Sequence, residues 1–210
     1  MVSDKLRDNK RRESPISVSG EGFIFEHSVQ AFFILQMMSG GFVPRMDGCE
    51  ITKVTLQSGR YGRNTDDCEV TLKERKTGEE KKLFIQIKRS FNLQPSNKAF
   101  TQTVKDAWND FIDPNFKKSH YRIALVTGEL DTNGSGLKNI LTHIQSSYRQ
   151  ADHFWGDYEN GCTNWSKPER EGLERFREKI KLANNGNDPG KEMEFLFFKS
   201  FFIIKSDMHE

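Results

Sequence analysis

Apolar residues follow two spacings along this chain. Between residues 22 and 38 they recur at the spacing that places them on one face of a helix, and Gly40 and Gly41 end the pattern. Other segments show the alternation or the short apolar runs typical of strands. The pattern predicts helices over 22–38, 98–112, 137–150 and 168–183, strands over 50–56, 68–74, 81–88 and 121–127, an irregular aromatic stretch over 152–166, and a strand-like run over 194–204.

The order of these elements predicts the fold class. Three strands between residues 50 and 88 are joined by loops, which favours an antiparallel meander. A helix then separates the third strand from the strand at 121–127, and a crossover of this kind makes the fourth strand parallel to a neighbour. We therefore expect an α/β protein with a mixed central sheet flanked by helices.

Length and composition limit the class of protein. With 210 residues, the chain is expected to form one elaborated domain over residues 20–210, preceded by a mobile basic arm over residues 1–19. Three scattered cysteines argue against a disulfide framework, and no apolar run is long enough to span a bilayer. A cytoplasmic protein without membrane association is therefore expected. The net charge of +2 leaves any nucleic-acid binding to be argued from a local site.

The hairpin between residues 65 and 89 carries most of the chemical information. A turn centred on Gly78 and Glu79 places Thr77 opposite Glu80, and this register pairs even with odd positions. One face of the hairpin is then apolar and the other is polar. The polar face brings together, at one end of the hairpin, the side chains of Asp67, Gln86 and Lys88, with Glu69 beside them.

Asp67, Gln86 and Lys88 form a set with a chemical use. A carboxylate and an amide oxygen are ligands that suit Mg²⁺, and the backbone carbonyl of Ile87 and water would complete the coordination. Lys88 beside such a metal would orient or deprotonate a water and offset charge on a phosphate. The alternative is that this face is the solvated side of an edge hairpin, held by a cross-strand ion pair.

Three segments of the chain, at residues 22–26, 65–70 and 83–89, resemble the PD-(D/E)xK nuclease superfamily in its QxK variant. They are most similar to the amino-terminal nuclease domains of bacterial antiphage effectors, which are the double-stranded DNA endonucleases of cyclic-oligonucleotide (CBASS) systems and related domains fused to STAND NTPases. The resemblance implies a restriction-endonuclease-like fold and hydrolysis of double-stranded DNA with Mg²⁺ or Mn²⁺.

The resemblance also assigns roles to particular residues. It makes Asp67 the metal-binding carboxylate, Gln86 the second ligand and Lys88 the catalytic lysine, and it matches Glu26 to the acidic residue that completes the metal site. The alternative for Glu26 is a surface glutamate near a helix start, favoured there by the helix dipole. Because Gln86 replaces an acid, one negative charge fewer holds the metal, and an inactive relative stays open as an interpretation.

Function and partners are expected as follows. The chain is a metal-dependent endonuclease for double-stranded DNA, excised from a longer effector with a sensor or NTPase domain, and it acts when copies self-associate. The alternative is a catalytically inactive module that binds nucleic acid or oligomerises. DNA contacts are expected from Arg89, Gln57 and Arg60, although ordinary surface positions would carry the same residues.

The remaining motifs favour structure over chemistry. The glycine-rich stretch at 127–136 lacks the endings of a phosphate-binding loop and predicts a flexible connection. The five histidines are scattered and indicate no metal cluster. Trp155, Tyr158 and Trp165 could stack on bases, but a small aromatic core beneath a long loop is the preferred interpretation.

Overall fold

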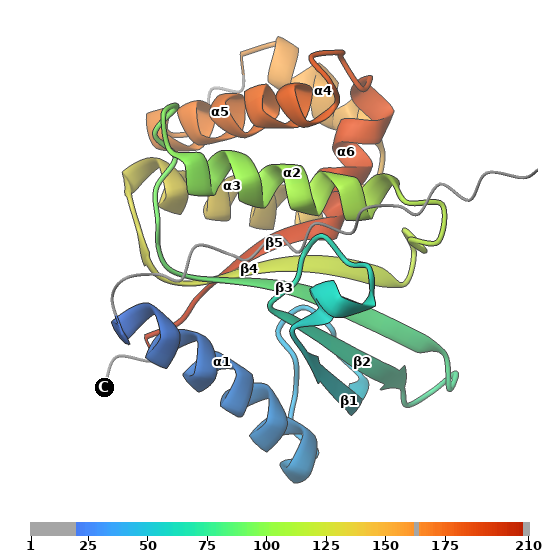
Figure 1. Ribbon diagram of the computed structural model, residues 1–210. Coiled ribbons are helices and arrows are strands. Elements are labelled where there is room, and N and C mark those ends of the chain that lie inside the picture. The colour runs from blue at the N-terminus through green and yellow to red at the C-terminus, as the bar shows by residue number, and fades with distance from the viewer. Residues whose placement is uncertain (1–19, 162–163, 208–210) are drawn as a thin grey trace, which may run out of the picture.

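A computed structural model describes residues 20–161 and 164–207, so the basic arm predicted at residues 1–19 lies outside the described residues. The helices and strands follow the order shown in Figure 1. Their bounds are α1 (Gly20–Ser39), β1 (Cys49–Leu56), the short 3-10 helix η1 (Ser58–Tyr61), β2 (Cys68–Glu74), β3 (Glu80–Phe91), α2 (Lys98–Ile112), β4 (Tyr121–Leu130), α3 (Thr132–Ser147), α4 (Ala151–Glu159), α5 (Lys167–Ala183), α6 (Lys191–Ser200) and β5 (Phe201–Lys205).

The five strands form one mixed sheet in the order β1-β2-β3-β4-β5. The strands β1, β2 and β3 pair antiparallel, whereas β4 is parallel to both β3 and β5. The predicted meander, the parallel fourth strand and the α/β class with a mixed sheet flanked by helices are therefore confirmed. The strand β3 lies at the centre of the sheet, because two strands follow it on either side.

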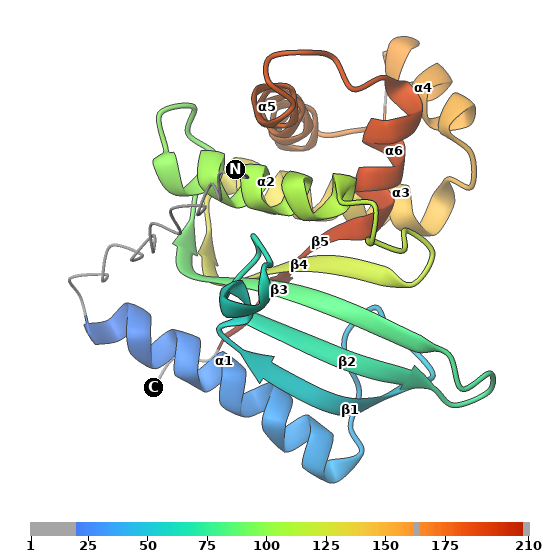
Figure 2. The same cartoon turned by 45° about the vertical axis from the view of Figure 1, so that its right-hand side comes forward.

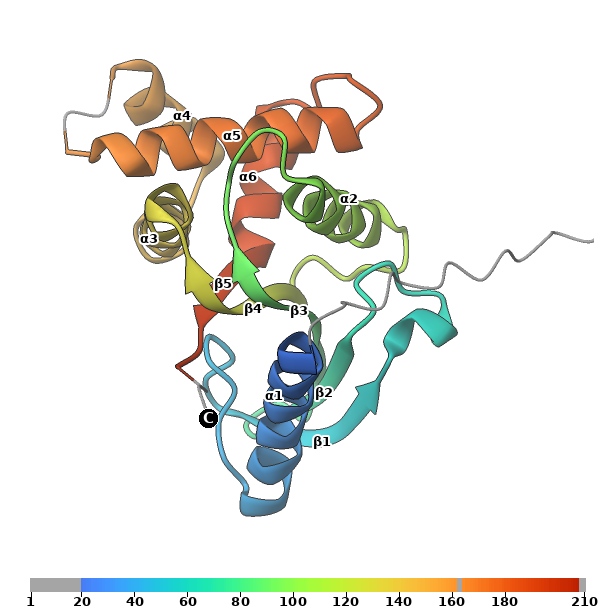
Figure 3. The ribbon, with the colours of Figure 1, turned by 60° about the vertical axis from the view of Figure 1, so that its left-hand side comes forward.

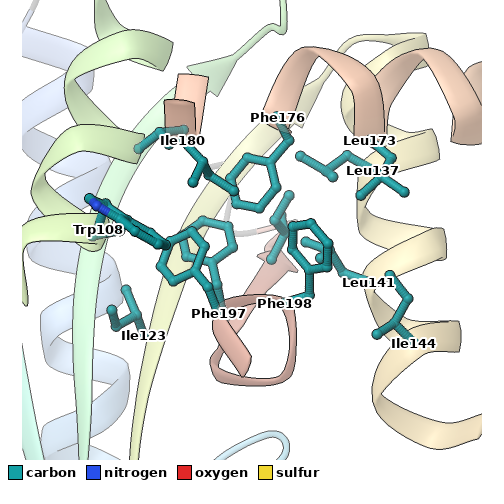
Figure 4. Packing of buried hydrophobic residues seen from close by; sticks show 14 of the residues in the cluster. Trp108, Ile123, Leu137, Leu141, Ile144, Leu173, Phe176, Ile180, Phe197 and Phe198 are labelled. Atoms are coloured by element: carbon teal, nitrogen blue, oxygen red, sulfur yellow. The ribbon is translucent and has the colours of Figure 1, made fainter. Parts of the chain in front are cut away.

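Helices cover the two faces of the sheet unequally. One face packs against α1 alone, through Phe25, Val29 and Phe33, whereas α2 to α6 lie on the other face (Figures 2 and 3). The larger core on that second face is rich in aromatic rings, and side chains from α2, β4, α3, α5 and α6 meet there (Figure 4). This large core holds α2 and the sheet together, which fixes the frame of the candidate site.

The hairpin β2–β3 has a different register from the one predicted. Lys73, not Thr77, lies opposite Glu80, a displacement of four residues along β2. The reason is the turn: the N–H of Gly78 donates to the carbonyl of Glu74, and Gly78 adopts a positive φ of 74°, so the connection is one helical turn ended by a glycine. Because the displacement is even, the predicted division of residues between the two faces survives.

The alternative interpretation of this face as the solvated side of an edge hairpin does not hold, although cross-strand ion pairs are present. Phe84 lies on the same face as Gln86 and Lys88 and is fully buried under the helices, and Gln86 is 5% exposed. Glu69 is also engaged there, because Lys82 Nζ lies 2.9 Å and Arg63 Nε 3.5 Å from its carboxylate. The hairpin is therefore central in the sheet, and its polar residues sit in a largely covered site.

Three other predictions were wrong in part. The strand-like run at 194–204 is the helix α6 followed by the short strand β5, and the aromatic stretch at 152–166 contains α4. Trp155 and Trp165 are buried in the large core, which confirms a packing role but places them in the main cluster. The predicted helix at 137–150 begins at Thr132, where Asp131 accepts a hydrogen bond from the N–H of Gly134 at 2.6 Å.

The stretch at 127–136 is consequently the end of β4 and the start of α3, not a flexible connection. Its glycines permit close helix packing: a Cβ atom on Gly136 would lie 2.3 Å from the carbonyl oxygen of Pro168, at the start of α5. Among the described residues, no helix combines the length and hydropathy needed to cross a membrane.

Candidate functional site

The observed register places Asp67 directly across from Gln86, at the point where β2 begins. The pairing of Cys68 with Ile85 is the last in the ladder, so Asp67 is the next residue outward. Its Oδ2 accepts hydrogen bonds from Gln86 Nε2 at 2.5 Å and from the backbone N–H of Ile87 at 2.6 Å. Lys88 Nζ lies 3.6 Å from the same oxygen. The structure therefore brings together the three residues that the sequence grouped.

The helix α1 brings Glu26 to this group through Gln30. One helical turn separates the two residues, and Gln30 Nε2 donates to Glu26 Oε1 at 3.1 Å. The same amide donates to the backbone carbonyl of Asp67 at 3.2 Å, and Gln30 is only 5% exposed. Glu26 is therefore a half-buried, partnered carboxylate next to Asp67, and the alternative of a solvated surface glutamate does not hold.

Burial dominates the electrostatics of Asp67, whose side chain is 15% exposed. Loss of hydration raises the pKa of Asp67 to about 6, although the Lys88 ammonium and the N–H of Ile87 both act to lower it. The negative charges of Asp66 and Glu26 act in the same direction as burial. A carboxylate with a raised pKa among like charges is a common property of metal-binding and catalytic sites.

The helix α2 contributes two aspartates that the sequence analysis did not single out. Asp110 is 2% exposed and holds the loop before β2, because its Oδ1 accepts from the N–H of Asn64 at 2.9 Å and its Oδ2 from the N–H of Thr65 at 2.7 Å. One turn earlier, burial raises the pKa of Asp106 to about 6, while a hydrogen bond from Gln102 Nε2 acts to lower it. Figure 2 shows this loop beneath α2.

Asp106 also belongs to the electrostatic surroundings of the site. The charges of Asp66 and Asp110 act to raise its pKa, and the charge of Lys88 acts to lower it. Lys88 therefore lies within the field of carboxylates from two directions, with Asp67 on the sheet and Asp106 on α2. Its side chain is 34% exposed, so solvent reaches the lysine between them.

The sequence contains signals for these additional residues. Gln30 lies four positions after Glu26 on a predicted helix, which places both on one side of it. Asp110 falls among the inward positions of α2, between Ala107 and Phe111, and a carboxylate at such a position indicates a buried partner. Neither signal identifies the residue that is bound. Asp67, the partner of Gln30, and Asn64 and Thr65, the partners of Asp110, lie far away in sequence.

The donor atoms of the site fit a hard divalent cation. Hydrogen bonds in the described part of the chain engage only Oδ2 of Asp67, only Nε2 of Gln86 and only Oε1 of Glu26. One oxygen of each side chain is thus left for a ligand, and oxygen is the donor that Mg²⁺ prefers. In a strand, the N–H and C=O of one residue point to the same side, so the carbonyl of Ile87 also faces Asp67.

The set of acidic ligands is small. Across residues 20–161 and 164–207, no group of three or more His, Cys, Asp or Glu side chains is arranged to hold a metal ion. At the candidate site, the two carboxylates Asp67 and Glu26 stand with the amide of Gln86. A cation held here would depend on two carboxylates, one amide and one backbone carbonyl.

The structure describes the side chains of two of the three residues predicted to contact DNA. Arg89 follows Lys88 on β3 and is half-buried, and its backbone carbonyl accepts from Thr127 Oγ1 at 3.5 Å. Gln57 is exposed, and its N–H donates to the carbonyl of Asp67 at 3.0 Å, so it borders the site. Arg60 lies in η1, but its side chain is outside the described part of the structure.

Comparisons of this chain with protein-family models, with curated proteins and with solved structures find no match.

Proposed function

We propose that this protein is a metal-dependent endonuclease that hydrolyses phosphodiester bonds of double-stranded DNA, built on a restriction-endonuclease-like version of the mixed sheet. The observation that carries the proposal is the convergence of Asp67, Gln86 and Lys88 at the start of β2, with Glu26 held beside them by Gln30. A buried carboxylate with a pKa of about 6, next to a lysine that solvent reaches, is an arrangement for chemistry rather than for stability.

Each residue of the site has a role in this proposal. Asp67, Gln86 and Glu26 hold the cation, Mg²⁺ or Mn²⁺, with the carbonyl of Ile87. The bound cation would supply Lewis-acid activation of the phosphate and of a water. Lys88 orients or deprotonates the attacking water and offsets negative charge on the phosphate. Gln30 keeps Glu26 turned toward the site, because it donates to Glu26 and to Asp67 at once.

The DNA partner and the biological setting are part of the same proposal. Arg89 follows Lys88 on β3, and Gln57 and Arg60 lie between β1 and β2; in this proposal the three residues contact phosphates of the duplex. The resemblance to antiphage effectors favours a role in defence, with a sensor or NTPase domain controlling the nuclease. Such control operates by bringing nuclease copies together.

The activity is tested by incubating supercoiled plasmid with the protein and Mg²⁺ or Mn²⁺, with and without chelator. Lys88→Ala is expected to reduce cleavage by at least about 10²-fold, because it removes a contact made to the developing charge in the transition state. Lys76→Ala is the matched control: this exposed lysine lies in the turn at the far end of the same hairpin, and cleavage should be unchanged. Parental activity in Lys88→Ala would refute the assignment.

The small acidic set favours a second candidate, a catalytically inactive module that binds nucleic acid or oligomerises. In the described residues, the site offers two carboxylates where Gln86 replaces a third. The plasmid experiment separates the two functions. A protein that shifts DNA in a gel but leaves it intact with either metal would be the inactive module.

A further inference from the structure

The outer face of α1 is unusually apolar for a helix at the surface. Phe23, Ile24, Leu35 and Met38 are 59%, 65%, 63% and 77% exposed. From Ser28 to the end of the helix there is no charged residue, although 30% of the whole chain is charged. Large exposed apolar side chains that gather on one surface mark an interaction site more often than scattered single residues do.

These side chains lie on one stripe. At about 100° per residue, Phe23, Ile24, Ala31, Leu35 and Met38 fall on the side of α1 opposite the buried Phe25, Val29 and Phe33, a set that packs against the sheet. Figure 1 shows α1 at the outside of the molecule, with its other side toward β1 and β3. A helix that is apolar on both sides is expected to be covered on both sides.

The stripe has the spacing of a helix–helix seam. Ile24, Ser28, Ala31, Leu35 and Met38 follow each other at alternating steps of four and three residues, the spacing of two helices that pack along their length. The two ends of the stripe are equidistant from Ala31, because Ile24 and Met38 each lie seven positions from it. An antiparallel pair of identical helices crossing at Ala31 would place Ile24 against the partner's Met38.

We propose that this stripe is the interface between two copies of this chain, related by a two-fold axis at Ala31. The small side chains of Ser28 and Ala31 let the helices approach closely at the centre, and the large ones fill both ends. Antiparallel packing also brings unlike ends of the helix dipoles together. The interface does not depend on the proposed nuclease activity.

The available area suits a dimer. An aromatic side chain buries roughly 150–250 Å² when it is covered, and large aliphatic side chains fall near the lower end of that range. At these exposures the four side chains supply on the order of 500 Å² of apolar surface. A standard interface buries about 800 Å² on each partner. Ala31, Ser28 and His27 lie on the same side of the helix and would contribute to the remainder.

Two other occupants fit less well. The sequence of residues 1–19 holds five basic and three acidic side chains, Lys5, Arg7, Lys10, Arg11 and Arg12 with Asp4, Asp8 and Glu13. Covering the stripe with that segment would bring charges against apolar surface. A membrane-surface helix normally carries lysine or arginine beside its apolar face, and α1 has neither.

The oligomeric state of the complete chain tests the proposal, measured by size-exclusion chromatography with light scattering over a concentration series. The wild-type protein should reach the mass of two chains at high concentration. Leu35→Glu should remain at 24.3 kDa, because dimerisation would bury its carboxylate. Leu182→Glu is the matched control: this leucine on α5 is 59% exposed and lies off the stripe, so that variant should dimerise like wild type.

The proposal is overturned if the wild-type chain stays at the mass of one chain throughout, or if Leu35→Glu dimerises like wild type. Since both leucines are exposed, equal unfolding temperatures at low concentration will show that the variants are folded.

Crosslinking tests the arrangement of the two helices independently of the charge variants. In a Cys162→Ser background, a mixture of Ile24→Cys and Met38→Cys chains should form a disulfide-linked dimer on mild oxidation, whereas Ile24→Cys alone should not. The native Cys49 and Cys68 are buried and will not compete. Crosslinking of Ile24→Cys to itself would overturn the antiparallel arrangement.

Discussion

At the scale of single residues, Asp67 has conflicting interactions. It accepts two hydrogen bonds and faces Lys88, and each of these favours the carboxylate. Burial nevertheless outweighs them, so its pKa lies near 6 rather than at the model-compound value of 3.8. Without a cation, the folded protein binds the proton on Asp67 more tightly than the unfolded chain does. A residue of this kind weakens the fold at neutral pH, a cost that is common at functional sites.

Asp67→Asn should therefore stabilise the chelated protein at pH 8, by up to about 3 kcal/mol. The sign follows from the raised pKa: the stabilising contribution of Asp67 is complete below about pH 4 and is lost as the pH rises through about 6. Asparagine does not ionise and keeps an oxygen to accept from Ile87. Denaturant unfolding of both proteins from pH 4 to 8 measures the difference, which should grow with pH.

A wild-type protein that is more stable than Asp67→Asn at pH 8 would contradict this account. So would a stability difference that does not change with pH, since it would reflect lost hydrogen bonds instead of ionisation. Adding Mg²⁺ provides a further check, because a cation that binds the carboxylate should stabilise the wild type and leave the variant unaffected.

At the scale of elements, the faces of the hairpin could be predicted but its register could not. The alternation of residues fixes which side chains share a face, and Asp67, Gln86 and Lys88 were grouped on that basis. The local sequence fits two turns: a short turn centred on Gly78 and Glu79, and the observed helical turn that ends at Gly78. The sequence alone does not decide between them. Because the predicted register was displaced by an even number of residues, every side chain kept its predicted face, and the candidate site kept its residues.

The aromatic run that forms α6 shows a different limit. Phe195, Phe197 and Phe198 are all buried, and a continuous apolar run fits a buried helix as well as a strand. The deciding signals are at its ends: Glu192 and Glu194 stand in the first turn and Lys199 in the last, as the helix dipole favours. Contacts from distant elements, such as the ion pair between Glu194 and Arg177, cannot be inferred from the run itself.

The close packing of α3 against α5 explains the glycine-rich start of α3, and it can be tested. Gly136→Ala should destabilise the protein by about 1–3 kcal/mol, because the new methyl group meets backbone atoms of Pro168 that cannot move aside. Gly156→Ala on α4 is the control, since nothing lies within 4 Å of its added Cβ and alanine favours a helix by about 1 kcal/mol. Equal unfolding free energies for the two variants would refute the packing argument.

At the scale of the whole molecule, α1 connects the candidate site with the proposed interface. Its inner side carries Glu26 and Gln30, and its outer side carries the stripe centred on Ala31. Glu26 lies five residues from Ala31, so two antiparallel copies would offset the two Glu26 backbones by about 15 Å along the helix axes. The two sites also lie on the inner sides of the helices, so the helix pair, with axes about 8–10 Å apart, would stand between them. A dimer would therefore hold two sites in one particle, where both can act on the same DNA molecule.

This arrangement predicts that double-strand breaks, unlike nicks, depend on dimerisation, and it rests on both proposals. Wild-type protein and Leu182→Glu should convert plasmid from nicked to linear more efficiently as concentration rises, because the second site acts at high effective concentration on a duplex already bound. Leu35→Glu should still nick, since Leu35 lies on the outer side of α1, away from the site, but should yield at least about tenfold less linear product per nick. If Lys88→Ala still nicks plasmid at the parental rate, the nuclease proposal is wrong. If Leu35→Glu is monomeric but gives the same amount of linear product per nick as wild type, the two sites do not cooperate.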